Sequence, residues 1–104
     1  MKNVEMFLTP QSSNVKAIGH SGTQLFVEFG SGSHLYIYER VDNNMFDCIL
    51  NAPSIGKFMI KHITRNAAFP FSKLALNESS ATYVFIYKPF PTVRPKPIVP
   101  SKFL

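Results

Sequence analysis

Short runs in which apolar residues alternate with polar ones predict β-strands in the first forty positions of the chain. Residues 24–29 alternate in this way, and residues 34–39 are rich in apolar and aromatic side chains. Four residues with two glycines separate these runs, so we expect a β-hairpin. A shorter run at residues 15–20 predicts a strand before the hairpin. Periodicity leaves open which alternate set of side chains in residues 34–39 faces the core.

Beyond this hairpin the apolar residues recur at spacings of three and four, which predicts amphipathic helices. The first helix is expected over residues 43–51, with Asp42 or Asn43 as its N-cap. Proline then interrupts the pattern, and a second helix is expected over residues 54–65 with Ser54 as its N-cap. One stripe of each helix is apolar and is expected to pack on the sheet.

The remainder of the chain is less regular. Residues 67–76 are interpreted as an irregular packed connector, and residues 82–87 as an additional strand. Five of the eight prolines lie in residues 89–104, where they alternate with basic residues and predict an extended tail. The sequence therefore predicts an α+β fold, in which a small antiparallel sheet packs with two short helices. It forms one domain over residues 1–88, followed by the proline-rich tail.

Composition narrows the class of protein. A chain of 104 residues supports a single hydrophobic core, and 45% hydrophobic with 16% charged residues is typical of a folded protein. The one cysteine, Cys48, excludes an internal disulfide and a cysteine-based zinc site. There is no run of about 18 apolar residues and no signal-like apolar segment of about 7 residues at the N-terminus. We therefore expect a cytoplasmic protein with no membrane contact.

Charge is distributed unevenly along the chain. Residues 1–52 carry three Lys or Arg against five Asp or Glu, a net charge of −2. Residues 53–104 carry eight against one, a net charge of +7. Such asymmetry favours an anionic partner such as nucleic acid, although a solvated basic face has the same signature.

The spacing of small and aromatic residues resembles the KTSC domain over residues 12–65. This module occurs at the C-terminus of some lysyl-tRNA synthetases and in short stand-alone bacterial and phage proteins. Its most specific part here is Ala52-x-Ser54-x-Gly56-Lys57-Phe58. The other matching positions are Ser12-Ser13, Val15, Ile18-Gly19-His20, Leu25-x-Val27-x-Phe29, Tyr36-x-Tyr38, Val41, Phe46, Leu50 and Ile63. The resemblance implies a small sheet followed by helices and at most a binding role without enzymatic activity, with nucleic acid, especially RNA, as the suggested ligand.

The sequence departs from the family pattern at several positions. His20 stands where the family commonly has Tyr, and Asp42 where it commonly has Pro. Met59-Ile60 replaces a Phe-Asn pair, so Ile60 cannot make any contact that this Asn makes. Residues 66–88 are an extension outside the resemblance.

The first functional hypothesis is an RNA-binding surface built from the second helix and from aromatic residues of the sheet. Helix N-termini and lysines attract phosphate, and exposed rings stack on unpaired bases. The alternative is that Ser54 is only an N-cap and that the tyrosines belong to the core. The predicted nucleic-acid-binding residues are Lys57, Lys61, Arg65, Lys16, Arg40, Tyr36, Tyr38 and Ser54.

The second hypothesis is a protein-interaction module, such as a phage-type inhibitor that docks on a larger host protein. Residues 82–87, with Tyr83 and Tyr87, could add a strand to a partner's sheet. The tail, with Arg94 and Lys96, could lie on an acidic or aromatic-lined surface. The alternatives are an ordinary strand of the chain's own sheet and a disordered end. Oligomeric state is left open.

Catalysis is the least supported class. Cys48 lies within a predicted amphipathic helix, where a buried thiol is inert. His20, His34 and His62 lack the spacing of a metal-binding motif, and no phosphate-cradling loop is present. We expect no enzymatic activity, no catalytic residue, no metal and no cofactor.

Overall fold

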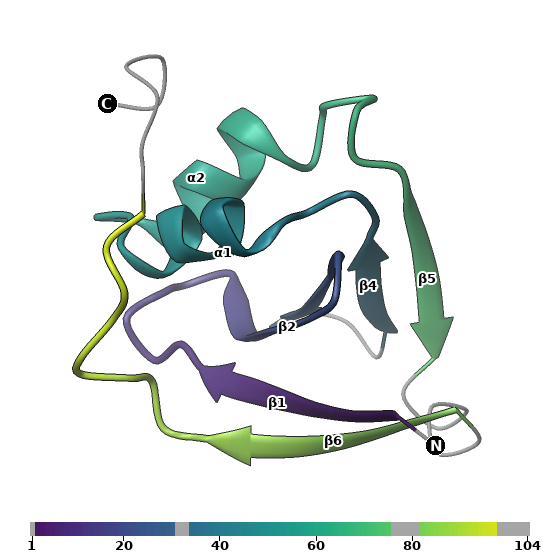
Figure 1. Cartoon of the computed structure of the whole chain (residues 1–104), viewed down its shortest axis with the longest axis horizontal. Coiled ribbons are helices and arrows are strands. Elements are labelled where there is room, and N and C mark those ends of the chain that lie inside the picture. Colours follow the sequence, from purple (N-terminus) through teal and green to yellow (C-terminus); the bar gives the residue numbers. More distant parts are fainter. Residues whose placement is uncertain (1, 31–33, 76–81, 98–104) are drawn as a thin grey trace.

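The computed structural model describes residues 2–30, 34–75 and 82–97 of the chain. Six strands form one sheet in the order β5-β4-β3-β2-β1-β6, and two helices cover one of its faces (Figure 1). Neighbouring strands are antiparallel except β1 and β6, which are parallel. The elements are β1 (Lys2–Leu8), β2 (Val15–Ser21), β3 (Gln24–Phe29), β4 (His34–Tyr38), α1 (Asn43–Leu50), α2 (Ile55–His62), β5 (Phe71–Ala75) and β6 (Tyr83–Lys88). The α+β class is as predicted.

Four of the observed strands were predicted, and their ends lie within one residue of the predicted ends. They are β2, β3, β4 and β6. The turn of the β3–β4 hairpin, residues 31–33, lies outside the described residues. The interpretation of residues 67–76 as an irregular connector is wrong, because Phe71–Ala75 pairs with β4 along its whole length. β1 was not predicted, and its parallel pairing with β6 makes the sheet mixed rather than purely antiparallel.

The two strands that the sequence analysis missed, β1 and β5, are defined more by hydrogen bonding to neighbouring strands than by an apolar–polar pattern of their own residues. In β5 no residue is buried, so no apolar alternation marks it in the sequence. In β1 Val4 and Met6 are buried on one face, but the strand is flanked by charged and polar residues. Its pairing with β2 requires close backbone approach, since a Cβ at Gly19 would lie 2.5 Å from the Glu5 carbonyl oxygen.

The helices begin where their caps predict. The Asp42 carboxylate accepts a hydrogen bond from Met45 N–H at 2.8 Å, and Asn51 closes the end of α1. The Ser54 hydroxyl accepts from Lys57 N–H, a longer contact of 3.4 Å. α2 ends at His62, three residues earlier than expected, because Thr64 N–H turns back to the Met59 carbonyl. Arg65 therefore lies in the turn after the helix.

Both faces of the sheet are buried. The helix side contains the larger core, in which Leu25 and Val27 of β3 and Tyr38 of β4 pack against Ile49 and Met59. The opposite face has its own core, formed by Val4, Met6, Ala17, Phe26, Leu35 and Ile37. This settles the orientation of β4: Tyr36 and Tyr38 face the helices, and the alternate side chains face the second core.

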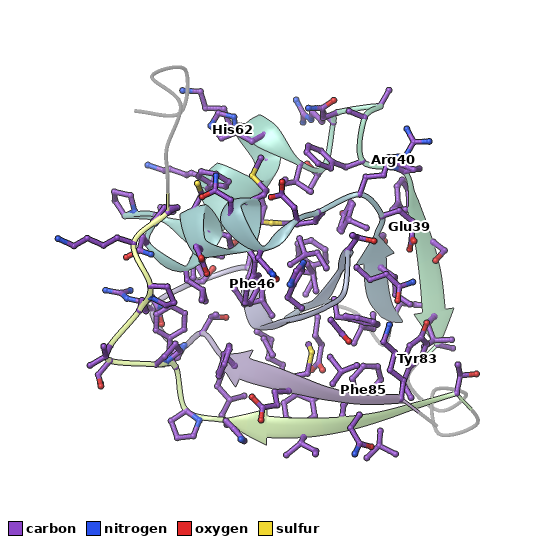
Figure 2. All side chains as sticks on the ribbon, viewed as in Figure 1. Glu39, Arg40, Phe46, His62, Tyr83 and Phe85 are labelled. Atoms are coloured by element: carbon purple, nitrogen blue, oxygen red, sulfur yellow. The ribbon has the colours of Figure 1, made fainter. Side chains whose placement is uncertain are left out.

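Strong curvature of the sheet closes the second core. β6 is three strands away from β3, yet the rings of Tyr83 and Phe85 lie 5.2 and 5.9 Å from the Phe26 ring. Figure 2 shows Tyr83 and Phe85 pointing from β6 into the interior. At the end of β6 the Tyr87 hydroxyl donates a hydrogen bond to the buried Glu28 carboxylate on β3, which also pairs with Lys16 at 3.3 Å.

The first part of the proline-rich segment packs back on the domain. Phe90 contacts the helix-side core, and the Arg94 guanidinium lies 5.4 Å from the Phe90 ring. Arg94 donates to the Leu50 carbonyl at 2.9 Å, and the Asn51 amide donates to the Pro95 carbonyl at 2.8 Å. The Arg94 bond supplies a partner to a carbonyl at the C-terminal end of α1, where helix carbonyls lack intrahelical donors, and the Asn51 bond ties the same end of the helix to the proline-rich segment. Residues 98–104 lie outside the described residues, and the division at residue 88 stays a prediction.

We expect Tyr87→Phe to destabilise the fold by about 1–2 kcal/mol, because the buried Glu28 carboxylate loses one of its two described partners. Urea unfolding at pH 7 measures the change in free energy. The matched control is Lys88→Gln, which removes the exposed Lys88–Glu5 ion pair at the end of the same strand. That control should cost less than about 1 kcal/mol. Equal losses in the two variants would contradict a clamp between β6 and β3.

Candidate functional site

An open groove lies between β4 and α2, on the helix side of the sheet. Its volume is about 470 Å³, within the range of roughly 300–1,000 Å³ that is typical of sites for small organic groups. We call it the β4–α2 groove. Its lining residues are Asn14, Phe29, His34, Tyr36, Tyr38, Ile60, Thr64 and Phe71. The groove therefore combines the aromatic residues of the sheet with the outer flank of the second helix.

Aromatic rings form the floor of the groove. Tyr36 is half-buried and packs edge-on against Phe29, with ring centroids 5.3 Å apart. Phe71 from β5 lies 5.6 Å from Tyr36 and 5.7 Å from Tyr38, and 54% of its surface is exposed. Phe71 is thus the ring most open to a stacking partner, whereas Tyr38 is 3% exposed and belongs to the core.

Burial also changes the ionisation of Tyr38. Its pKa is raised to about 12, first because burial disfavours the phenolate and second because the neighbouring Tyr36 phenolate would repel it. Tyr38 is therefore neutral throughout the physiological pH range. It supports the floor of the groove from below.

Cations lie close to the groove. On the sheet side, the Lys73 ammonium lies 5.4 Å from the centre of the Tyr36 ring, which it faces across the β4–β5 pair. On the helix side, Lys57 and Lys61 are exposed, and Lys57 precedes the lining residue Ile60 by three positions within α2. Residues at that spacing are neighbours on a helix surface. Arg65 lines an adjoining hollow that shares Thr64 and Phe71 with the groove.

Asn14 is held firmly at one end of the groove. Its backbone carbonyl accepts from Gly30 N–H at 3.0 Å, and its side-chain oxygen accepts from the Ser12 hydroxyl at 3.1 Å. The amide rests on α2 at Gly56, where an added Cβ would overlap the Asn14 side-chain oxygen. Gly56 therefore permits the close approach of the Asn14 side chain to α2.

The structure gathers only part of the predicted nucleic-acid-binding set around the groove. Tyr36 lies in the groove with Tyr38 beneath it, and Arg65 lines the adjoining hollow. Lys57 and Lys61 are exposed on α2 but do not line the groove. Ser54 caps α2, as its alternative interpretation states.

The remaining two members of that set lie elsewhere. Lys16 pairs with Glu28. Arg40 follows Glu39 at the end of β4, where Glu39 N–H donates to the Pro70 carbonyl (Figure 2). Arg40 has a positive φ of 64°, which marks the sharp turn from the sheet into α1.

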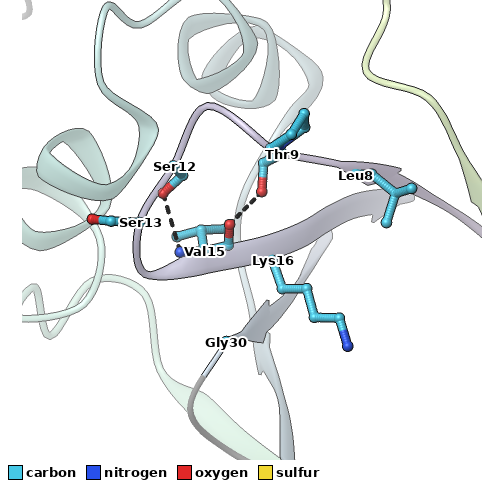
Figure 3. A pocket seen from close by; sticks show the side chains of 8 residues that line it. Leu8, Thr9, Ser12, Ser13, Val15, Lys16 and Gly30 are labelled. Carbon is cyan, nitrogen blue, oxygen red and sulfur yellow. Dashed lines mark hydrogen bonds between the residues drawn. The ribbon is translucent and has the colours of Figure 1, made fainter.

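Lys16 lines a separate hollow with a volume of about 390 Å³, which shares no residue with the β4–α2 groove. Figure 3 shows that two of its hydroxyls are engaged: Thr9 donates to the Val15 carbonyl, and Ser12 accepts from Val15 N–H. Leu8 and Pro10 contribute apolar surface. This hollow therefore offers little to a polar ligand.

The residues predicted for partner binding have mixed positions. Tyr83 is half-buried against Phe26, and Tyr87 donates to Glu28. Burial raises the pKa of Tyr87, and the hydrogen bond to Glu28 raises it further. Arg94 is bound to the end of α1, while Lys96 is exposed.

Sequence reasoning missed four residues of the site: Phe71, Lys73, Ile60 and Asn14. Phe71 and Lys73 lie in the segment that was interpreted as a connector, so their pairing with Tyr38 and Tyr36 was invisible. Ile60 was considered only as a departure from the family pattern, but it lines the groove and is 46% exposed. An isolated Asn in a polar loop carries no sequence signal.

Groups that could support catalysis are dispersed. Cys48 is 5% exposed, and its pKa is raised by burial and then by the nearby Asp47 and Asp42 carboxylates. His20 stacks on Phe46 at 4.9 Å and contacts the Val41 carbonyl, and the His62 ring lies 4.6 Å from Phe58. Within residues 2–30, 34–75 and 82–97, no three His, Cys, Asp or Glu residues cluster as metal ligands would.

Fold and groove together define a small α+β module with one aromatic groove bordered by cations. The family model of the KTSC domain matches residues 11–66, more than half of the chain. The chain therefore belongs to the KTSC domain family. A search of curated proteins finds no match. In the part of the chain that the structure describes, no helix has the length and apolar character needed to cross a membrane.

The match also separates two origins of the groove. Asn14, Tyr36 and Ile60 come from the family domain, whereas Phe71 and Lys73 come from the extension beyond residue 66. The extension therefore enlarges the surface of the family domain at this edge of the sheet.

We expect alkaline pH to destabilise the fold partly through Tyr38. An exposed tyrosine in the unfolded chain ionises near pH 10, whereas Tyr38 in the fold has a pKa of about 12. The unfolded chain therefore loses this proton first, and stability falls as pH rises from 10 to 12. Tyr38 should account for a loss on the order of 1 kcal/mol between pH 9 and 11. The free energy of unfolding of wild type and Tyr38→Phe in urea, measured at these pH values, checks this loss. If the free energies of the two proteins change with pH in parallel, Tyr38 does not cause the loss.

Proposed function

We propose that this chain is a non-catalytic module that binds single-stranded RNA in the β4–α2 groove. The observation that carries the proposal is that an exposed ring, Phe71, shares one groove with the Tyr36 ring and its Lys73 cation, beside a hollow lined by Arg65. Unpaired bases stack on aromatic side chains, and lysines attract the phosphates that connect them. The resemblance to a module of tRNA synthetases points to the same ligand.

Stacking is assigned to Phe71 and, after a shift of Lys73, to Tyr36. Lys73 lies over the Tyr36 ring at 5.4 Å, a cation–π contact of the kind worth about 0.5–1 kcal/mol at exposed sites. Because this contact is weak, a base that stacks on the Tyr36 ring can displace the flexible Lys73 side chain. Its ammonium then remains close enough to pair with a phosphate of the same strand.

Electrostatic attraction is assigned to Lys57, Lys61 and Arg65 on the helix side, opposite Lys73. Lys57 and Lys61 lie one turn apart, a spacing at which like charges repel by a few tenths of a kcal/mol. A phosphate bound next to Lys57 and Lys61 relieves this repulsion between the two ammonium groups. The placement of the cations around the rings, rather than the net charge, favours a nucleic acid over a generic anion.

The test is fluorescence anisotropy with a labelled, mixed-sequence, single-stranded RNA 12-mer at low salt. Phe71→Ala should weaken binding by about 5- to 100-fold, since stacking contributes about 1–3 kcal/mol per base. Val93→Ala, which truncates another exposed apolar side chain far along the chain, is the matched control and should change little.

Charge variants supply the second readout. Lys73→Gln should lower the slope of log affinity against log salt by about 0.7, whereas Lys96→Gln on the proline-rich segment should not. The proposal fails if binding is undetectable at low salt, or if Phe71→Ala and Val93→Ala behave alike.

A second candidate function is protein docking through the free edge of β6. Val84 is 37% exposed and Ile86 is 42% exposed, and no charged residue interrupts the strand between Tyr83 and Tyr87. Exposed edge strands are usually protected by charge or proline, so this edge is suited to pairing with a strand of another protein.

The edge is tested with the double variant Val84→Lys, Ile86→Lys. We expect it to abolish recovery of a defined partner in affinity purification after RNase treatment, because buried lysines disfavour strand pairing. Lys96→Gln is the control for the tail. Affinity for the RNA 12-mer should be unchanged in both variants, which separates this function from the groove. Unchanged partner recovery in the lysine variant excludes docking at β6.

A further inference from the structure

The β4–α2 groove continues past Phe71 into a second hollow. This hollow has a volume of about 530 Å³, and Thr64 and Phe71 line both it and the groove. We call it the Arg65 hollow, since Arg65 lines it together with Ala67 and Pro70. Phe71 therefore lies between two hollows, and 54% of its surface is exposed.

This continuity bears on the length of RNA that the site accommodates, and the inference rests on the proposed RNA binding. We propose that the Arg65 hollow is a second nucleotide subsite, so that the site binds two consecutive nucleotides with Phe71 between their bases. One base lies in the β4–α2 groove and the next base in the Arg65 hollow. The phosphate that joins them crosses the boundary formed by Thr64 and Phe71, next to the Arg65 guanidinium.

The turn between α2 and β5, which carries this hollow, is held at both ends. At the helix end, the Asn66 amide donates to the His62 carbonyl at 3.2 Å, and its side-chain oxygen accepts from Ala68 N–H at 3.0 Å. At the sheet end, the Pro70 carbonyl accepts from Glu39 N–H at 2.8 Å. The turn is therefore tied to both α2 and β4. A preformed surface of this kind loses little conformational entropy when a ligand binds.

The Arg65 hollow offers the two interactions that a nucleotide requires. The Phe71 ring is exposed at its boundary, and every base has a face that stacks on such a ring. Arg65 is exposed, and a guanidinium pairs with a phosphate through two parallel hydrogen bonds. Among the described residues that line the hollow none is acidic, so no carboxylate there repels a phosphate.

The first experiment measures how affinity grows with the length of the ligand. Uridine 5′-monophosphate, the dinucleotide pUpU and the corresponding tetranucleotide displace a labelled 12-mer from the full chain, followed by anisotropy at low salt. We expect pUpU to bind about 5- to 100-fold more tightly than the mononucleotide, the contribution of one further stacked base. The gain from two to four nucleotides should be smaller, because both subsites are then already filled.

Two neighbouring alanines supply a matched pair of variants. Ala67 and Ala68 are both exposed, but only Ala67 lines the Arg65 hollow. Ala67→Leu should fill part of the hollow and remove most of the gain from one to two nucleotides, while the affinity for the mononucleotide stays unchanged. Ala68→Leu should leave both affinities as in wild type. Circular dichroism verifies that each variant is folded.

Arg65→Gln tests the phosphate contact separately, and it keeps the inference testable if Ala67→Leu does not fold. It should lower the slope of log affinity against log salt for pUpU by about 0.7, whereas Lys96→Gln should not. The inference alone is overturned if the mononucleotide and pUpU bind wild type equally well, if the two leucine variants behave alike, or if Arg65→Gln leaves the slope unchanged. Absence of binding of the 12-mer overturns the proposed function as well.

Discussion

Phe26 lies at the centre of the sheet with no exposed surface, and the curvature that buries it sets the positions of the other elements. The helices cover only one face of β3, so the other face requires a cover from the sheet itself. β6 supplies it with Tyr83 and Phe85, and β1 bridges the gap by pairing with both β6 and β2. Aromatic burial of this kind is a large favourable contribution in a small domain, where the core is limited. The bond from Tyr87 to Glu28 then fixes β6 at its far end.

The same arrangement leaves the groove open. The two short helices pack on side chains of β2, β3 and β4, and no described residue of β5 belongs to that core. The rings of Tyr36 and Phe71 therefore continue the core outward as a partly exposed surface, and α2 forms the opposite wall with Ile60. A site of this type forms where the edge of a hydrophobic core is left partly exposed. The aromatic residues that pack at this edge are then also accessible to a ligand. Arg94 and Pro95 bind at the end of α1 and do not line the groove.

Individual residues show how far sequence reasoning reached in this protein. Asp42 and Ser54 were recognisable as helix caps because their hydrogen bonds are local, within three residues. β2, β3, β4 and β6 were recognisable from short-range patterns of apolar residues. β5 was missed because its residues are exposed and its only definition is the pairing with β4, which precedes it by more than thirty positions. Two of the four missed site residues, Phe71 and Lys73, belong to that strand. Lys16 and Arg40 are basic as the prediction required, but the fold directs them elsewhere.

The sequence by itself determined the α+β class, the helix caps, the resemblance to the KTSC domain and the concentration of positive charge after residue 52. All of these depend on residue type or on neighbours within about one turn or one hairpin. Tertiary structure alone decided that Tyr36 meets Phe71, that Asn14 rests on Gly56 and that Glu28 is shared by Lys16 and Tyr87. These contacts join residues far apart in the chain, and they form only because one curved sheet must bury both of its faces.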